Sequence, residues 1–185
     1  MDLILPLIPL ILTLLLLLAA ILFIVWMVQN ILLEAPFLPL PRPVVMVVSD
    51  LVDLSPGDEF YDLGSGDGRV VRALAKKYPQ AKCFAVEKAL LPHLLSIFFN
   101  LWKRSPNVFQ IRTDFKHQPL KRAKVVFVYL FPEVMGALST KLMRELSPGA
   151  TIISAQFTFP GLVPNKVVKV QDGVREFKLY VYHLA

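Results

Sequence analysis

The hydrophobic positions of the chain begin with one continuous apolar run. From Leu3 to Leu33 no side chain is charged. A run well beyond about 18 apolar residues is typical of a membrane-spanning helix. Because proline suits the first turn of a helix better than its middle, we expect the regular span to begin near Pro9 and to end between residues 30 and 33. Residues 1–35 are therefore predicted to be a transmembrane anchor.

The charge pattern predicts how this anchor is oriented. The N-terminus, Met1-Asp2, lacks the basic region of a secretory signal peptide, and the apolar run is longer than such a peptide needs, so we expect the anchor to be retained. Every Lys and Arg lies after position 41, so the positive-inside rule places the N-terminus outside and the C-terminal domain in the cytoplasm. Since no Arg-rich transit segment precedes the span, we expect a prokaryotic cytoplasmic membrane rather than an organelle's inner membrane.

A second pattern follows a proline-rich stretch, residues 36–43, which we interpret as a short extended linker. From position 44 onward, short apolar runs alternate with helical patterns. We expect strands at 59–63, 82–86, 108–112, 124–130 and 150–155, and helices at 44–54, 69–78, 90–103 and 133–146. Such alternation is typical of a parallel α/β sheet with helices on both faces. The β-rich runs 167–170 and 176–183 flank an Asp-Gly pair, so we add an antiparallel hairpin and predict seven strands.

The predicted helix over residues 90–103 is apolar on most of its faces and carries Phe98, Phe99 and Trp102. Such a helix either faces a membrane or packs on the sheet. In a fold with helices on both faces of a sheet, packing is the commoner arrangement, so we expect this helix to pack on the sheet.

Charge and cysteine content narrow the function classes. Residues 1–35 hold two acids and no bases, so the remaining residues carry a net charge of +8. A basic domain is attracted to anionic lipid or to nucleic acid, and the apolar run favours lipid. Cys83 is the only cysteine, which excludes an internal disulfide framework and agrees with a reducing compartment. The histidines lack metal-ligand spacing, so no metal site is predicted. They are His93, His117 and His183.

The stretch YDLGSGDGRV, residues 61–70, places three glycines between a predicted strand and a predicted helix. Without side chains, they let the backbone pass close to a ligand at the helix N-terminus, or they serve only a tight turn. These glycines are Gly64, Gly66 and Gly68. A dinucleotide-binding loop has the spacing G-x-G-x-x-G, whose third glycine would fall at Arg69. The spacing therefore disfavours a nicotinamide cofactor.

Residues 62–68, DLGSGDG, instead resemble motif I of the class I, seven-β-strand methyltransferases, D/E-x-G-x-G-x-G, which bind S-adenosylmethionine. The resemblance covers most of residues 44–185 and implies a Rossmann-like sheet of seven strands. It implies that the glycine loop and Ser65 hold the methionine end of the cofactor, with Asp62 near its ammonium group.

The ends of the next two strands carry further acids. Glu87, 19 residues after Gly68, is where this fold needs a carboxylate for the ribose hydroxyls, although a strand-end Glu can also be merely solvated. Asp114 takes the place of the family's acceptor for the adenine amino group, with Phe115 beside the ring, although an Asp in a turn needs no ligand. Both acids are predicted cofactor-binding residues.

The fourth predicted strand ends in Tyr129-Leu130-Phe131-Pro132, beside the methyl donor in this fold. Tyr129 is therefore also predicted to contact the cofactor. Enzymes that methylate amino groups of adenine or glutamine typically have D/N-P-P-Y here, so its absence disfavours those substrates. VYLFPEVM and the later SAQFTFPGLVP resemble the membrane-anchored protein lysine methyltransferases whose eukaryotic members modify the ATP synthase c subunit and the adenine nucleotide translocase. Leu162, where many relatives have an aromatic residue, and Lys88-Ala89 depart from the family pattern.

The resemblance implies direct in-line attack by a neutral lysine amine on the sulfonium methyl group. A narrow aromatic channel would suit the cationic groups involved, although each of its members could equally be a core residue. The candidates are Tyr129, Phe131, Phe157 and Phe159. Glu133 fits the first turn of a helix better than a substrate-steering role. Two alternatives stay open: an RNA methyltransferase on the same fold, which the basic domain would suit, and a non-catalytic membrane-tethered module.

Overall fold

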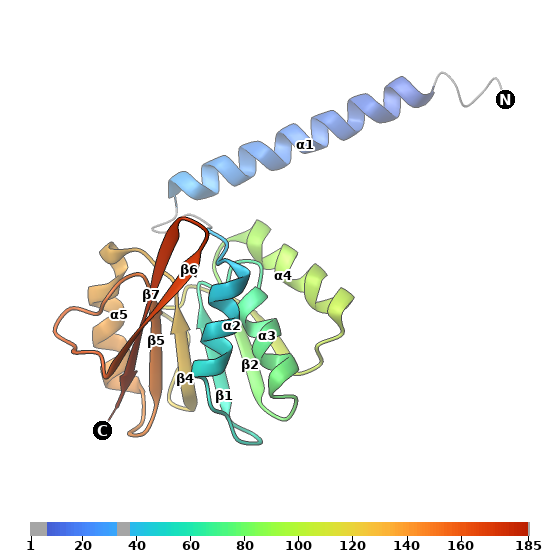
Figure 1. The fold of residues 1–185 in the computed structure, drawn as a ribbon. Coiled ribbons are helices and arrows are strands. Elements are labelled where there is room, and N and C mark those ends of the chain that lie inside the picture. Colours follow the sequence, from blue (N-terminus) through green and yellow to red (C-terminus); the bar gives the residue numbers. More distant parts are fainter. Residues whose placement is uncertain (1–6, 33–37, 185) are drawn as a thin grey trace. The chain divides into compact units, whose positions relative to one another are not determined.

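The computed structural model describes residues 7–32 and 38–184, which fall into two units (Figure 1). The first unit is helix α1, Leu7–Leu32. It begins two residues before Pro9, which then occupies the first turn, where its missing amide hydrogen costs no hydrogen bond. Among the described residues, the segment Leu7–Val28 is long and apolar enough to cross a bilayer, a test that a signal sequence near the N-terminus would also pass.

The second unit is built on a seven-stranded sheet in the order β3-β2-β1-β4-β5-β7-β6. The strands are β1 (Glu59–Leu63), β2 (Lys82–Glu87), β3 (Val108–Arg112), β4 (Ala123–Val128), β5 (Thr151–Ala155), β6 (Lys166–Asp172) and β7 (Arg175–His183). The first five are parallel, and β7 runs antiparallel to both β5 and β6. This confirms the predicted mixed sheet. The strand order reverses between β1 and β4, where ligands bind in open α/β sheets.

Four helices surround this sheet, and they are α2 (Arg42–Leu51), α3 (Arg69–Lys77), α4 (Leu90–Lys103) and α5 (Pro132–Glu145). Right-handed crossovers place α3 and α4 on one face and α5 on the other. Figure 1 shows α2 and α3 in front of the strands. The main core lies between these two helices and the sheet, where Phe60, Leu74 and Phe127 are at most 2% exposed.

Helix α2 begins earlier than the sequence suggests. It starts at Arg42, inside the stretch that we interpret as a linker, and ends at Leu51 rather than at position 54. Pro41 is the N-cap in an extended conformation and Pro43 lies in the first turn. Both positions tolerate a missing amide hydrogen, so these prolines initiate the helix rather than prevent it. The helix predicted over residues 44–54 therefore begins two residues earlier and ends three residues earlier than expected.

Helix α4 turns its apolar side away from the sheet. Its buried residues are Pro92, His93 and Ser96. Trp102 is 70% exposed and Phe98 is 53% exposed. The prediction that this helix packs on the sheet is confirmed, because α4 contacts β2 and β3, but most of its large apolar side chains face outward. A polar residue of β3 explains the reversal, because Ser96 Oγ donates a hydrogen bond to Gln110 Oε1 over 2.9 Å.

Candidate active site

The glycine loop joins β1 to α3 in a conformation that side chains would strain. Gly64, Gly66 and Gly68 have φ angles of 78°, 56° and 73°, in the left-handed region that favours glycine. A Cβ at Gly68 would lie 2.1 Å from Ser96 Oγ, so the loop also packs tightly on α4. The amides of Gly64 and Ser65 donate to the carbonyl of Val86 over 2.9 and 3.0 Å. The loop is thereby fixed at the end of β2.

Glu87, the last residue of β2, holds the glycine loop by hydrogen bonds from backbone amides. Its Oε2 accepts from the Gly66 amide and its Oε1 from the Ala89 amide, both over 2.8 Å. Burial raises the pKa of Glu87 above its ordinary value, and the backbone donors oppose that rise. Each carboxylate oxygen has two lone pairs, so both can still accept a ligand hydroxyl. The geometry suits the predicted ribose contact.

Asp62 and Ser65 are buried at the start of the loop. Among the described residues, neither Asp62 Oδ2 nor Ser65 Oγ has a hydrogen-bond partner. Burial, followed by the charges of Glu87 and Asp67, raises the pKa of Asp62 well above its ordinary value. A buried carboxylate oxygen without a partner is costly unless a ligand supplies a donor or a positive charge. An ammonium group supplies both, so these residues fit the amino-acid end of S-adenosylmethionine.

Two arginines hold the loop, and this clamp is not evident in the sequence. Arg69 Nη2 pairs with Asp67 Oδ2 over 2.7 Å, and its Nη1 donates to the carbonyl of Leu40 over 2.8 Å. Arg72 Nη1 donates to the carbonyl of Asp67. The residue that breaks the dinucleotide spacing therefore has a structural role. Only the Asp67–Arg69 pair had a sequence signal, an acid and a base two positions apart.

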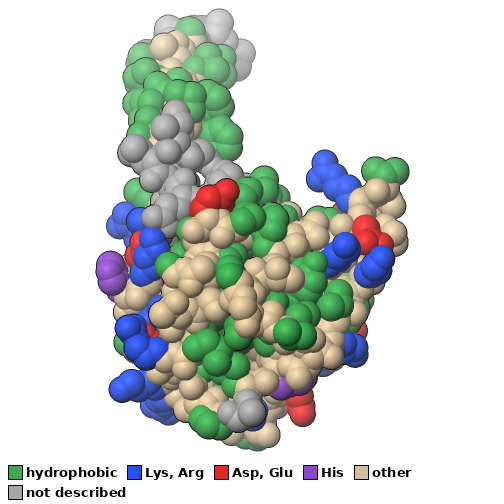
Figure 2. All heavy atoms as spheres, turned by 90° about the vertical axis from the view of Figure 1, so that its left-hand side faces the viewer, with side chains coloured by type: hydrophobic (Ala, Val, Ile, Leu, Met, Phe, Trp, Pro, Cys, Tyr) green, Lys and Arg blue, Asp and Glu red, His purple; other side chains and the backbone are tan. Residues whose placement is uncertain are grey.

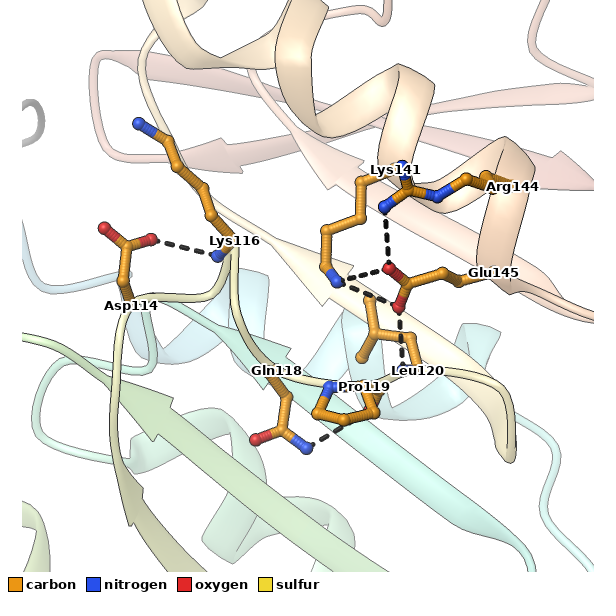
Figure 3. Close-up of polar contacts among 8 residues, drawn as sticks. All are labelled: Asp114, Lys116, Gln118, Pro119, Leu120, Lys141, Arg144 and Glu145. Atoms are coloured by element: carbon orange, nitrogen blue, oxygen red, sulfur yellow. Dashed lines mark hydrogen bonds and ion pairs between the residues drawn. The ribbon is translucent and has the colours of Figure 1, made fainter.

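Asp114 follows β3 and is engaged on both oxygens. Its Oδ2 pairs with Lys88 Nζ over 3.0 Å. Its Oδ1 accepts from the Lys116 amide over 2.9 Å, as Figure 3 shows. Burial raises the pKa of Asp114, but these donors outweigh it and leave the pKa below its ordinary value. The carboxylate is therefore ionised and held in place beside Lys88, one of the departures from the family pattern. Phe115, next to it, is half-buried.

The connection from β3 to β4 is attached to α5 by Glu145 (Figure 3). The Leu120 amide donates to Glu145 Oε2 over 3.1 Å, and Lys141 Nζ lies 2.7 Å from Glu145 Oε1. Arg144 adds a third contact at 3.2 Å. Burial raises the pKa of Glu145, but Lys141 and Arg144 outweigh it, so the pKa is lowered. Sequence inspection does not reveal this cluster, because Leu120 is 25 residues from Glu145.

The four candidate channel aromatics take different places. Phe131 and Phe157 are half-buried, and their ring centroids lie 6.2 Å apart at the carboxyl ends of β4 and β5. Tyr129 packs edge-on against Phe177 at 6.5 Å, and burial raises its pKa. Phe159 is 1% exposed and packs on Tyr182 at 5.6 Å, so the structure places it in the core. Phe131 and Phe157 are left as the accessible aromatic pair.

The loop after β5 depends on two polar residues that the sequence did not reveal. Ser154 Oγ donates to the carbonyl of Phe157 over 2.6 Å. Gln156 has a φ of 69°, and its side-chain oxygen accepts from the Lys178 amide over 3.0 Å. These contacts fix Phe157 relative to β7. The sequence gives only a weak indication of these two roles, because Ser and Gln are ordinary loop residues at the end of a strand.

The described residues give little support for metal or thiol chemistry. No group of three or more His, Cys, Asp or Glu among them could hold a metal ion. Burial raises the pKa of Cys83 to about 12, which keeps this thiol protonated. The side of the domain that carries α5 shows hydrophobic side chains toward its middle and Lys and Arg at its margins (Figure 2).

Comparison with known proteins identifies the family. The family model of the ANTKMT methyltransferase domain matches residues 62–166. This range begins at Asp62 and includes the glycine loop, Glu87, and Phe131 and Phe157 after β4 and β5. The chain belongs to this methyltransferase family. The predicted resemblance is thereby confirmed, and the enzyme is an S-adenosylmethionine-dependent methyltransferase.

Curated relatives act on protein lysines. A protein-lysine N-methyltransferase of Saccharolobus islandicus is 31% identical over 80% of this chain and 93% of its own length. Adenine nucleotide translocase lysine N-methyltransferase of Mus musculus is 33% identical, with 74% of this chain and 59% of the relative covered. The Xenopus laevis lysine N-methyltransferase of the ATP synthase c subunit is 31% identical, with 57% and 46% covered. The chain thus spans about half the length of these vertebrate relatives.

Solved structures agree on the fold and on the cofactor. An RNA methyltransferase from Salinibacter ruber, in complex with S-adenosyl-L-homocysteine, has a TM-score of 0.72 at 28% identity and covers 80% of this chain and 94% of its own. Precorrin-6y C5,15-methyltransferase from Geobacter metallireducens has a TM-score of 0.66 at 14% identity, with 82% and 93% covered. The second shows the fold alone. The bound product in the first confirms S-adenosylmethionine as the methyl donor of this fold.

Proposed function

We propose that this methyltransferase is anchored in a membrane by α1 and methylates a lysine side chain of a protein substrate. The buried carboxyl of Asp62, whose Oδ2 has no hydrogen-bond partner among the described residues, is the observation that supports cofactor binding beside the glycine loop and Glu87. The three curated relatives, all protein-lysine N-methyltransferases by name, support the lysine half. The half-buried pair Phe131 and Phe157 supplies a surface for the acceptor side chain.

Different residues of the chain bind different groups of the cofactor. Asp62 and Ser65 receive the ammonium group, whose charge keeps Asp62 ionised against the burial that raises its pKa. Glu87 accepts from the ribose hydroxyls while its backbone donors hold it in place. Asp114 and Phe115 contact the adenine group of the cofactor. When bound, S-adenosylmethionine supplies a methyl group on a positively charged sulfur.

The acceptor amine must reach the site uncharged. The ordinary pKa of lysine is about 10.4, and removal from water lowers it because burial disfavours the charged form. Phe131 and Phe157 bind the incoming lysine by contact with its methylene groups and, before the proton is lost, with its cationic form. They also exclude water from the approach, which favours the neutral amine. Fixed alignment of two reacting groups contributes about 7–11 kcal/mol to rate acceleration, so a strong general base is not required.

The membrane half of the proposal rests on α1 and on charge. The segment Leu7–Val28 is long enough to span a bilayer, and the residues after position 35 carry a net charge of +8. All bases lie on the C-terminal side of the span, which supports an N-out orientation with the catalytic domain in the cytoplasm. The vertebrate relatives are named for the ATP synthase c subunit and for adenine nucleotide translocase, and we accordingly propose a membrane-associated protein substrate.

Transfer of a labelled methyl group tests the acceptor. The full chain and its Glu87→Ala variant are incubated with labelled S-adenosylmethionine and, in separate reactions, with membrane proteins and with total RNA. We expect label in protein, at lysine by peptide mass spectrometry, and none with the variant. Label in RNA alone would reject the protein substrate and favour the activity of the Salinibacter ruber relative. Cofactor binding without label in either fraction would favour the non-catalytic alternative.

A further inference from the structure

The outward side of α4 is an apolar stripe. Leu94, Leu95, Phe98, Leu101 and Trp102 are between 45% and 72% exposed. Their spacing, i, i+1, i+4, i+7 and i+8, places all five on one side of a helix. Single exposed Leu or Phe residues are common, but five contiguous ones mark a binding surface.

The buried residues of α4 are Pro92 and the polar residues His93 and Ser96, so the exposed apolar residues lie outside the core. His93 and Ser96 are buried, and Ser96 bonds to Gln110 on β3. His93 Nδ1 and Asn100 Oδ1 are buried on the inward side as well. The usual arrangement of a surface helix, apolar inward and polar outward, is therefore reversed. A contiguous exposed apolar side of this kind marks an interaction site.

The charges around this stripe select its partner. Between Glu87 and Asp114 the sequence contains no acid. Lys103 and Arg104, directly after the stripe, are exposed, and Arg112 on β3 is exposed as well. Basic residues beside an apolar helix face match anionic lipid headgroups, where each nearby base contributes about 1 kcal/mol. A second copy of the chain would bring the same basic residues together, which like-charge repulsion disfavours.

The proposed anchor keeps a bilayer within reach. Nine residues separate the end of α1 at Leu32 from the start of α2 at Arg42, and a fully extended chain of that length spans about 30 Å. We propose that α4 lies on the anionic surface of the membrane in which α1 is anchored, with Phe98 and Trp102 in the interfacial layer. This inference rests on the proposed membrane anchoring and extends it, because it gives the catalytic domain a second lipid contact.

Fluorescence of Trp102 tests the lipid contact. Trp26 and Trp102 are the only tryptophans, so the full-length Trp26→Phe variant reports on α4 alone. This protein is reconstituted into vesicles of phosphatidylcholine with or without phosphatidylglycerol, and some lipids carry bromine on the upper acyl chain as a quencher. We expect loss of Trp102 emission in the anionic vesicles and a smaller loss in the neutral ones. Unchanged emission in both would overturn the proposal.

Two variants in the same background separate the stripe from general surface effects. Phe98→Ser leaves the polar inward side intact and should reduce the quenching of Trp102. Val174→Ser, at a fully exposed position in the β6–β7 turn, should leave it unchanged. Equal quenching in Phe98→Ser and in the parent would contradict an apolar lipid contact. Intermolecular crosslinking through Trp102→Cys, together with unquenched Trp102 emission in the parent protein, would instead identify a second copy as the partner and overturn the proposal.

Two further measurements keep this inference distinct from the proposed function. Extraction with alkaline carbonate shows whether α1 is inserted, and binding of S-adenosylhomocysteine shows whether the domain is folded. An inserted, cofactor-binding protein whose Trp102 is not quenched refutes only the α4 contact. A protein that carbonate extracts from the vesicles refutes the membrane anchor, and with it the surface contact as proposed.

Discussion

A single methyl group added at Gly68 tests how tightly the glycine loop packs against α4. At its φ of 73°, alanine costs roughly 1–2 kcal/mol because of the left-handed conformation alone. The new Cβ would lie 2.1 Å from Ser96 Oγ and 3.0 Å from Arg72 Nη1. Relief of such overlap in a packed region costs about 1–3 kcal/mol more. Gly57→Ala is the matched control, since Gly57 has a φ of 86° and open space around it.

Thermal unfolding of the full chain in detergent, followed by circular dichroism, measures this difference. For a chain of this size, 1 kcal/mol shifts Tm by about 2–4 °C, so Gly68→Ala should unfold about 2–12 °C below Gly57→Ala. Ser96→Ala in the Gly68→Ala background removes the overlapping oxygen and should recover part of that loss. Equal Tm values for the two glycine variants would refute the packing argument, because only the backbone cost would then be present.

Three further predictions concern the site. Burial and neighbouring acids raise the pKa of Asp62, so the stability of the cofactor-free protein should fall as pH rises through that pKa. Asp62→Asn should make this fall smaller when Tm is measured over a series of pH values. Glu87→Gln should weaken S-adenosylhomocysteine binding about 10- to 150-fold by calorimetry, the loss expected for hydrogen bonds to a charged group, and unchanged affinity would exclude the ribose contact. Phe131→Ala should raise KM for the protein substrate about 2- to 30-fold while cofactor affinity stays constant, whereas Phe159→Leu should lower Tm instead.

The sheet was predictable from the sequence because burial imposes a short-range pattern. Each parallel strand is a brief apolar run followed by a turn, and the Asp-Gly pair at 172–173 indicates the hairpin between β6 and β7. The glycine motif was informative for a related reason. Left-handed backbone angles leave a direct signature in the residue types, and the structure finds those angles at Gly64, Gly66 and Gly68.

Several of the contacts that the sequence did not predict join distant parts of the chain. Nothing near α4 in sequence shows that Gln110 would draw the polar side of the helix inward. Phe159 is buried by Tyr182, which lies 23 residues later on β7. Where nearly every position of a helix is apolar, periodicity cannot tell which side faces the sheet, and only the residues of the opposing strand decide it.

The hydrogen bond from Arg69 to Leu40 bears on how the catalytic domain can be separated from α1. The carbonyl of Leu40 lies two residues before α2 and receives the same guanidinium that holds Asp67 in the glycine loop. A soluble fragment that starts at Arg42 would keep every helix and strand of the domain but would remove this acceptor and the buried Leu40 side chain. The glycine loop is thus held in part by a residue that precedes the first helix of the domain. The smallest fragment that keeps this contact begins at or before Leu40.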